Sequence, residues 1–360
     1  MINEKKIKIY IIQPLIPHYR IPFFDGLARL YDLYIRYGRD DPSFKSIHTN
    51  YTKKVKGVFL GKIEFFFVFL DIWRVKPDVI VTYGEVKQLT NLFLIPYKYI
   101  LDFKLLIWSH GFKNNKLSLT DRIRLAEMKL ADGVIFYTHN CFTNAKKFKL
   151  KNTCYLNNTI QTISPKKSPQ DKKTIANSLP YNIKTTLNGV FISRFTEVKK
   201  PRLLLDIMTQ IHSKNKNIGF IIIGDGVIKP DFSSYDFIYD FGKVYDNKKK
   251  SALLSLADFA IMPSGIGLSV IECFSYRLPM FTLSNKMEDI EHGVEYSYLK
   301  HNINSYIAKN VRELTNTIAS IDKTELSFFG NNTDRLVHEN LTIDNMVKNF
   351  LTFIETLQAH

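Results

Sequence analysis

Cysteine is scarce in this sequence, which contains three in 360 residues: Cys141, Cys154 and Cys273. Their wide separation excludes a disulfide-stabilised scaffold, and no Cys-x-x-Cys pair or cluster of histidine and cysteine indicates a zinc site. So few, scattered thiols favour a reducing compartment. The first ten residues lack the apolar core of a signal peptide, so we expect the protein in the cytoplasm.

Acidic residues are outnumbered, with 34 Asp and Glu against 50 Lys and Arg, and the formal net charge is +16. This excess predicts an anionic partner, and charge alone does not choose among a nucleic acid, a phosphorylated substrate and an acidic bilayer surface. The basic residues are dispersed and no nucleic-acid-binding motif is present, so we expect no nucleic-acid partner. A basic nucleic-acid-binding protein is kept as the alternative from another functional class.

Long apolar runs are absent as well. The aromatic run at residues 63–73 is far shorter than the ~20 residues that a membrane-spanning helix needs. Because Lys62 and Arg74 flank it, we expect either a buried helix or an aromatic face that rests on lipid. The lysines within residues 146–151 add to the second interpretation, in which the protein is peripheral on the inner face of the cytoplasmic membrane.

Strand-like apolar runs alternate with helix-period stretches in both halves, which predicts the α/β class with parallel sheets covered by helices. The strands expected in the first half are 7–12, 79–82, 105–108 and 134–137. Those expected in the second half are 189–193, 218–223, 237–239, 259–262 and 280–283, with helices at 201–212, 248–256 and 268–276. Two similar lobes predict a cleft between them, and ligands bind outside the carboxyl ends of such strands.

A polar, proline-bearing segment without periodicity, 164–186, is typical of a linker. We therefore expect a first domain at 1–163, a second domain at 187–337 and a C-terminal helix within 338–360. That helix is predicted from apolar residues at helical spacing: Met346, Phe350, Phe353, Ile354 and Leu357. We expect it to pack back toward the first domain.

Two basic residues, Arg194 and Lys199, follow the first expected strand of the second half. A guanidinium and an ammonium group at a strand end can clamp a diphosphate and stabilise its departure. Two solvated surface side chains are the simpler interpretation of this pair taken alone. The pair therefore needs support from neighbouring motifs.

Two glycine-bearing loops follow the next strands. Gly224-Asp225-Gly226 ends a buried strand, where it either lets a ligand approach the backbone or forms a plain tight turn. The loop Gly242, Lys243 and Val244 offers backbone groups that can read the edge of a nucleotide base. Neither loop is specific by itself.

A third glycine-bearing loop leads from a strand into a helix, where backbone N–H groups and the helix dipole favour an anion. Its residues are Ser264, Gly265, Ile266, Gly267 and Leu268. Glu272, in the second turn of the helix, either accepts the hydroxyls of a ribose or lies in solvent. Together these features predict a phosphate-bearing ligand.

In this order and spacing, the motifs resemble the donor-binding lobe of glycosyltransferase family 4, whose members have the two-lobed GT-B fold. The matching segments are Arg194…Lys199, Gly224-Asp225-Gly226, Gly242-Lys243-Val244, Ala257-Asp258 and Pro263-Ser264…Gly267-Leu268…Glu272. In the first half, Pro17-His18-Tyr19-Arg20 resembles the loop after the first strand, and Ser109-His110-Gly111 resembles the central-cleft histidine motif. The resemblance extends over roughly residues 7–307.

The resemblance implies a nucleotide-diphospho-sugar donor. It implies Arg194 and Lys199 on the diphosphate, Glu272 on the ribose and Gly242–Val244 beside the base. It also implies that His110 hydrogen-bonds the donor sugar as a third catalytic group. The expected acceptor-side residues are Pro17, His18, Tyr19 and Arg20, and Arg20 faces either the acceptor or the diphosphate.

One position departs from the family pattern, which usually has two glutamates eight residues apart. Ser264 stands where the first glutamate is expected. That glutamate normally helps to hold the donor sugar, and backbone groups of Gly265–Leu268 are expected to replace it. No Asp-x-Asp sequence occurs, so a metal-bridged diphosphate is not expected, and neither is any other cofactor.

The function implied by the resemblance is that of a retaining, metal-independent glycosyltransferase. Its acceptor is expected to be a saccharide hydroxyl, in a lipid-linked oligosaccharide of O-antigen, capsule or exopolysaccharide assembly. In such enzymes the oxygens of the leaving group take the acceptor proton, and the carboxylate pair of glycoside hydrolases is not expected. The alternatives are a GT-B-fold nucleotide-sugar epimerase, a sugar phosphorylase and, because of Ser264, a non-catalytic pair of lobes.

Overall fold

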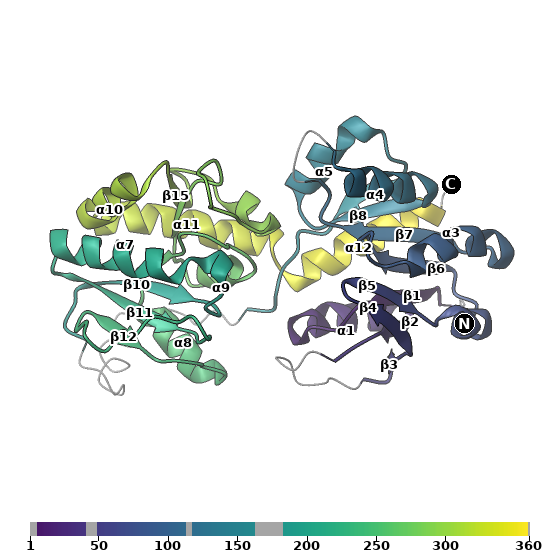
Figure 1. The fold of residues 1–360 in the computed structure, drawn as a ribbon, viewed down its shortest axis with the longest axis horizontal. Coiled ribbons are helices and arrows are strands. Elements are labelled where there is room, and N and C mark those ends of the chain that lie inside the picture. Colours follow the sequence, from purple (N-terminus) through teal and green to yellow (C-terminus); the bar gives the residue numbers. More distant parts are fainter. Residues whose placement is uncertain (1–5, 41–48, 113–116, 163–182, 359–360) are drawn as a thin grey trace. The chain divides into compact units, whose positions relative to one another are not determined.

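The computed structural model describes residues 6–40, 49–112, 117–162 and 183–358, and its contacts divide the chain into two compact units (Figure 1). The first unit comprises Met1–Gln161 together with Thr342–His360, and the second comprises Thr162–Leu341. Each unit contains its own parallel sheet. Most of the expected linker at 164–186 lies outside the described residues.

The first unit is built on a seven-stranded parallel sheet with the order β3-β2-β1-β6-β7-β8-β9. Its strands are β1 (Lys8–Gln13), β2 (Asp32–Tyr37), β3 (Thr52–Lys54), β6 (Val79–Tyr83), β7 (Lys104–Ser109), β8 (Gly133–Phe136) and β9 (Thr153–Tyr155). The central strands are almost entirely buried, as expected for a sheet that is covered on both faces. The strand order reverses between β1 and β6, the place where open sheets of this type bind ligands.

Short loops at the carboxyl ends of these strands lead into the helices of the first unit. The helices are α1 (Ile21–Leu30), α2 (Phe69–Val75), α3 (Thr90–Leu101), α4 (Leu119–Leu130) and α5 (His139–Ala145), with 3-10 turns η1 (His18–Arg20) and η2 (Lys146–Phe148). Polar residues fix the helix starts: Ser118 and Asp121 form a reciprocal capping box at α4, and the Thr138 side chain caps α5.

The C-terminal helix α12 (Ile343–Gln358) belongs to the first unit, although the second unit precedes it in the sequence. It packs against α1 and β9. The buried ring of Phe350 lies 6.1 Å from that of Phe23 on α1 and 6.1 Å from that of Tyr31. The predicted packing of this helix toward the N-terminal domain is confirmed.

The second unit contains a six-stranded parallel sheet with the order β12-β11-β10-β13-β14-β15. Its strands are β10 (Leu187–Ile192), β11 (Ile218–Ile223), β12 (Ile238–Asp240), β13 (Phe259–Ile261), β14 (Met280–Leu283) and β15 (Ser305–Ala308). This is the doubly wound order, with its reversal between β10 and β13. The predicted α/β fold with two Rossmann-like lobes is confirmed.

Three helices of the second unit connect strands of its sheet, and two more follow the last strand. They are α7 (Pro201–Lys214), α8 (Asn247–Leu256), α9 (Ser269–Ser275), α10 (Val311–Ser320) and α11 (Lys323–Asn340), with 3-10 turns η3 (Glu197–Lys199) and η4 (Val294–Tyr298). Helix α10 packs against α7, β14 and β15, and α11 packs against α9. These contacts cover the sheet and leave the strand ends to the loops.

The aromatic run at 63–73 is not a single helix, so the interpretation as a buried helix is wrong. The strands β4 (Gly57–Leu60) and β5 (Ile63–Phe66) form an antiparallel hairpin, and α2 begins after Val68. Phe66 and Val68 are fully buried, whereas Phe67, Leu70 and Trp73 are exposed. In the part of the chain that the structure describes, no helix has the length and apolar character needed to cross a bilayer.

Candidate functional site

The reversal of strand order in the second sheet brings two of the predicted motifs together. Arg194 and Lys199 follow β10, and the loop 264–268 follows β13. Lys199 joins the two loops, because its Nζ donates a hydrogen bond to the carbonyl oxygen of Gly265 and lies 3.6 Å from Met262 Sδ. The loops that carry the two motifs are thus in contact at the ligand-binding position of this sheet type.

Lys199 lies in a poorly solvated place. Its pKa is lowered from 10.5 to about 8, mainly by burial; the carboxylate of Glu295 opposes this shift, and the Arg194 charge adds to it. Glu295 is itself buried, at 6% exposure, on η4. An ammonium group that has lost water gains much from an incoming anion, so Lys199 is suited to a phosphate oxygen.

The Gly224-Asp225-Gly226 turn is fixed against the loop after β10. Ser193 N donates to Ile223 O at 3.1 Å, and Phe195 N donates to Asp225 O at 3.0 Å. A Cβ atom on Gly224 would lie 1.9 Å from Ser193 O, and one on Gly226 would lie 2.3 Å from Phe195 O. Both glycines are therefore required by the close approach of the two loops.

The loop after β12 continues this edge. Gly224 N donates to Gly242 O at 2.8 Å, and Lys243 Nζ lies 3.5 Å from Asp225 Oδ2. A Cβ atom on Gly242 would meet no atom within 4 Å, so the backbone faces open space there. Val244, two residues after Gly242, is half-buried. The residues expected beside the base thus form one surface with the Gly-Asp-Gly turn.

Ser264 is fully buried and bonded to the backbone. Its hydroxyl donates to Glu291 O at 3.0 Å and accepts from Glu291 N at 3.1 Å. Gly265 N also donates to Glu291 O, at 2.6 Å. The serine that replaces the family's first glutamate therefore anchors the loop after β14 to the loop after β13.

The following residues present backbone N–H groups. Ile266 N donates to His292 Nδ1 at 3.2 Å, and Gly293 N donates to Ile266 O at 2.7 Å. Within the described residues, the amides of Gly267 and Leu268 donate to no partner, and a Cβ atom on Gly267 would meet nothing within 4 Å. These two amides are available to an anion that approaches the loop.

His292 holds this loop in its neutral form. Since Nδ1 accepts the Ile266 amide proton, the ring proton is on Nε2, which lies 2.9 Å from Leu283 O. Burial lowers the pKa of His292 from 6.5 to about 4, although the bond to Leu283 O opposes the shift. The ring also stacks on Tyr296, with centroids 4.3 Å apart.

Glu272 lies in the first turn of α9 and faces α8. Its Oε1 is 2.5 Å from Lys250 Nζ, and the two side chains are 18% and 28% exposed. The carboxylate is therefore oriented by an ion pair. Lys250 was not singled out from the sequence, because it is one of three consecutive lysines without a motif.

In the first unit, His110 lies between aromatic rings at the end of β7. Its ring stacks on Tyr137, with centroids 3.9 Å apart, and meets the edge of Tyr83 at 6.1 Å. The side chain is half-buried. Its contact with a donor sugar stays a prediction.

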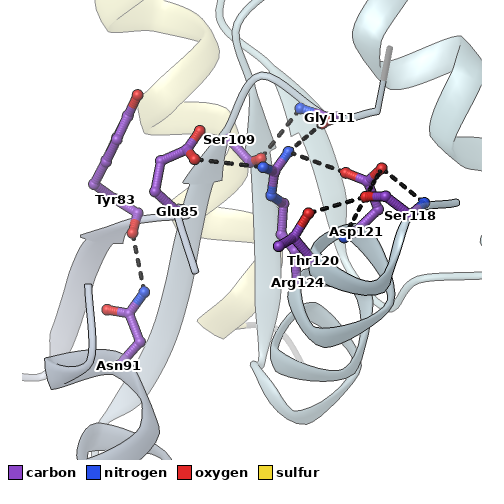
Figure 2. Close-up of polar contacts among 9 residues, drawn as sticks. All are labelled: Tyr83, Glu85, Asn91, Ser109, Gly111, Ser118, Thr120, Asp121 and Arg124. Carbon is purple, nitrogen blue, oxygen red and sulfur yellow. Dashed lines mark hydrogen bonds and ion pairs between the residues drawn. The ribbon is translucent and has the colours of Figure 1, made fainter. Parts of the chain in front are cut away.

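Arg124 on α4 contacts both the loop after β6, at Glu85, and the loop after β7, at Gly111 (Figure 2). Its Nη1 donates to Gly111 O at 2.9 Å, and its Nη2 lies 3.4 Å from Glu85 Oε2. Asp121 lies 3.8 Å away on the same helix. The loops after β6 and β7 are therefore held by one guanidinium group, which no sequence motif indicated.

The four expected acceptor-side residues differ in their exposure to solvent. Pro17 and Tyr19 are half-buried and His18 is exposed. Arg20 is 6% exposed, with its guanidinium 4.9 Å from the Trp108 ring and its Nη1 3.7 Å from Met346 Sδ on α12. This environment gives Arg20 a packing role between α12 and the end of β7.

The described residues contain no group of three or more His, Cys, Asp or Glu side chains with the geometry of a metal site. Arg194 and Lys199 lie in the segment that follows β10. Sequence reasoning missed Lys250, Glu295 and Arg124. Each of these acts through a partner that is distant in the sequence, so no local spacing indicates it.

Residues 187–339 match the family model of glycosyl transferases group 1. The matched residues lie within the second unit. A search of curated protein sequences finds no match to the chain. The match agrees with the family resemblance seen in the motifs of this half.

Among solved structures, Anabaena Alr3699/HepE in complex with UDP superposes with a TM-score of 0.72 at 14% identity, over 97% of this chain and 100% of that one. The lipopolysaccharide outer core galactosyltransferase WaaB, apo form, gives 0.66 at 12% identity, over 97% and 99%. A UDP-GlcNAc 2-epimerase from Methanocaldococcus jannaschii gives 0.56 at 14% identity, over 92% and 99%. At these identities the likeness establishes the fold.

Proposed function

We propose that this chain, whose residues 187–339 form a glycosyl transferases group 1 domain, moves a sugar from a nucleotide-diphospho-sugar to a hydroxyl group of a saccharide acceptor. The observation that carries the proposal is the bridge between the two loops at the reversal of the second sheet. There Lys199 contacts Gly265, beside the available amides of Gly267 and Leu268. Cationic and amide donors in one place match the two phosphates of such a donor.

The remaining parts of the donor fit the neighbouring loops. Glu272 supplies a carboxylate oriented by Lys250 for the ribose hydroxyls, and the open backbone at Gly242 lies next to the Gly-Asp-Gly turn for the base. A UDP complex of the similar HepE fold makes UDP the first nucleotide to test.

The proposed step is a metal-independent transfer with retention. The bond between the anomeric carbon and the phosphate oxygen breaks as the acceptor hydroxyl attacks from the same face. The acceptor proton passes to an oxygen of the leaving phosphate. Arg194, Lys199 and the amides of the 264–268 loop stabilise the negative charge of the departing nucleoside diphosphate, which is where electrostatic catalysis acts.

The proposed acceptor is a lipid-linked oligosaccharide at an anionic membrane surface, in the assembly of a surface polysaccharide. The net charge of +16 supports a negatively charged surface as partner. The fold of WaaB, named a lipopolysaccharide outer core galactosyltransferase, is consistent with this class of acceptor. We further propose that the protein acts from the cytoplasmic side.

Transfer assays test this function directly. Purified protein is incubated with radiolabelled UDP-, GDP-, CDP- and ADP-sugars and a pool of lipid-linked saccharides, with and without EDTA. We expect transfer from one nucleotide series and equal rates with the chelator. Absence of transfer from every donor, together with absence of thermal stabilisation by any nucleoside diphosphate, would overturn the proposal.

A nucleotide-sugar epimerase is the second candidate, because the fold of a UDP-GlcNAc 2-epimerase is also similar. An epimerase changes the sugar nucleotide without any acceptor. Chromatography of each sugar nucleotide after incubation with the protein alone distinguishes the two. Conversion under those conditions would favour the epimerase.

A further inference from the structure

Exposed apolar side chains are concentrated in one stretch of the first unit. Among the described residues, eleven of the twenty-one large apolar side chains that are exposed fall within residues 58–100. They are Val58, Phe59, Leu60, Ile63, Phe67, Leu70, Trp73, Leu92, Phe93, Tyr99 and Ile100. Concentrations of this kind mark interaction surfaces.

The β4–β5 hairpin contributes one fully apolar face. Its register pairs Val58 with Phe65 and Leu60 with Ile63, so these four side chains lie on the same face. The opposite face carries Phe66, which is fully buried in the core. On the outward face Val58, Leu60 and Ile63 are exposed, Leu60 at 70%, and Phe65 is half-buried.

Phe65 connects this face to the two adjacent helices. Its ring lies 5.3 Å from Phe67, 6.1 Å from Phe69 on α2 and 5.4 Å from Phe93 on α3. Phe69 and Phe93 also contact each other, at 6.4 Å. The hairpin, α2 and the start of α3 therefore form one continuous apolar surface.

Helix α3 extends that surface with a face that carries no charge. Its exposed residues follow the i, i+1, i+4, i+7, i+8 spacing of one helix side: Leu92, Phe93, Pro96, Tyr99 and Ile100. The only charged residue of the helix, Lys98, is buried and pairs with Asp132 at 3.1 Å. A helix side of this composition is unusual next to water.

Basic residues border this surface, and two of the carboxylates near it are paired within the fold. Lys62 is exposed in the hairpin turn, Arg74 follows Trp73 on α2, and Lys87 precedes α3. The carboxylates of Glu64 and Asp71 form ion pairs with Arg39 and Arg36. An anionic partner would therefore meet uncompensated positive charge at the edges.

We infer that the surface formed by the outer faces of the β4–β5 hairpin, α2 and α3 docks on an anionic lipid bilayer. The apolar side chains would enter the boundary between headgroups and acyl chains, and the bordering lysines and arginine would contact lipid phosphates. Trp73 and Tyr99, both exposed, have the amphipathic rings that favour this boundary. The inference deepens the proposed function and rests on it, because docking on a membrane would bring the protein to its proposed lipid-linked acceptor. Vesicle binding can be measured without that acceptor.

Tryptophan fluorescence reports on this surface selectively. The chain has two tryptophans, and Trp73 is 57% exposed whereas Trp108 is 1% exposed. We expect vesicles of phosphatidylglycerol and phosphatidylcholine to shift the emission to shorter wavelength, and brominated acyl chains to quench it. Phosphatidylcholine alone should bind less strongly, and salt should weaken binding. Unchanged emission with anionic vesicles would overturn the inference.

A matched pair of variants separates this surface from general charge effects. Leu70→Asp and Leu119→Asp make the same change at side chains that are 75% and 74% exposed, both near helix starts of the first unit. In flotation assays we expect Leu70→Asp to weaken vesicle binding about tenfold from lost apolar burial, and Leu119→Asp to stay within about twofold. Equal effects of the two variants would contradict the inference.

Two further measurements distinguish membrane docking from dimer formation and from damage to the donor site. If light scattering shows a dimer that Leu70→Asp dissociates, and vesicles do not bind, the surface joins two copies of the chain and the inference fails. UDP binding is measured by calorimetry in the same variants and is expected to be unchanged. A loss of vesicle binding with normal UDP binding would contradict only the membrane surface. A loss of UDP binding with normal vesicle binding would contradict only the proposed donor site.

Discussion

Lys250 and Glu272 form an ion pair between α8 and α9, with Nζ 2.5 Å from Oε1. The pair fixes the carboxylate of Glu272 before any ligand arrives. In the proposed complex, the fixed carboxylate meets the ribose without first losing its own rotational freedom. Such preorganisation strengthens binding by reducing its entropic cost.

The first prediction concerns the ribose. Glu272→Gln is expected to raise the Kd for UDP about tenfold, the effect of losing one charge-assisted hydrogen bond. The Kd for inorganic pyrophosphate, which has no ribose, should stay the same. Calorimetry with both ligands checks this, and Lys250→Met should show a smaller effect in the same direction. Lys248→Met, an exposed lysine of the same helix, serves as control. Equal losses for UDP and pyrophosphate would place Glu272 elsewhere.

The second prediction follows from the lowered pKa of Lys199, about 8. If the bound diphosphate needs the ammonium form, UDP affinity falls about tenfold between pH 7 and pH 9, since the protonated fraction falls by that factor. Lys199→Met should bind weakly at both pH values. Lys243→Met, at an exposed lysine, should keep the pH dependence. A wild-type affinity that does not change with pH would argue against Lys199 on the diphosphate.

The same group affects stability with a defined sign. Its pKa is lower in the folded protein than the ordinary 10.5, so the unfolded chain binds more protons between about pH 8 and 10.5. The contribution of Lys199 to the free energy of unfolding therefore rises with pH in that window. It should be absent from Lys199→Met.

The third prediction contrasts two glycines. Gly224→Ala places a Cβ atom 1.9 Å from Ser193 O, and we expect it to lower the free energy of unfolding by about 3 kcal/mol through overpacking. Gly267→Ala meets no atom within 4 Å, so its melting temperature should match the wild type. UDP affinity should still fall, because the methyl group blocks the available amides. If Gly267→Ala binds UDP normally, the phosphates do not approach this loop.

The fourth prediction concerns acid. The pKa of His292 is about 4 in the folded protein against 6.5 ordinarily, so the unfolded chain binds more protons between those values. Its contribution to the free energy of unfolding is therefore complete above pH 6.5 and is lost as the pH falls toward 4. Urea unfolding at pH 7, 5.5 and 4.5 should show a steeper loss for the wild type than for His292→Gln. The exposed His139→Gln should behave like the wild type.

Five of the six strands in the sheet of the second unit were predicted from the sequence, and β15 was missed. The expected strands 218–223 and 280–283 coincide with β11 and β14, because continuous apolar runs bounded by turns are typical of buried parallel strands. Once the strands are predicted, the motif loops are placed as well, because the carboxyl ends of parallel strands lie at the same edge of a sheet. In the first unit β2 was missed, because Asp32 at its start and Arg36 near its end interrupt the apolar pattern.

Contacts between distant segments were not predictable. The pattern of residues 63–73 does not reveal the hairpin, because β5 pairs with β4, which lies outside that run. The residues of β4 are largely exposed and lack the alternation of buried and exposed positions that predicts a strand. Ser264 was interpreted as a lost sugar contact, yet its two bonds to Glu291 depend on a loop 27 residues away. Lys250 and Glu272 likewise meet only once α8 and α9 are packed.

Calorimetric titration of UDP into the wild-type protein and into the Arg194→Ala, Lys199→Ala double variant, both in EDTA, tests the central claim most directly. The account predicts saturable binding at one site in the wild type and a loss of at least about a hundredfold in the double variant, from two charge-assisted contacts. GDP, CDP and ADP are titrated in parallel. Undiminished binding in the double variant, or absence of binding by all four nucleotides, would contradict it.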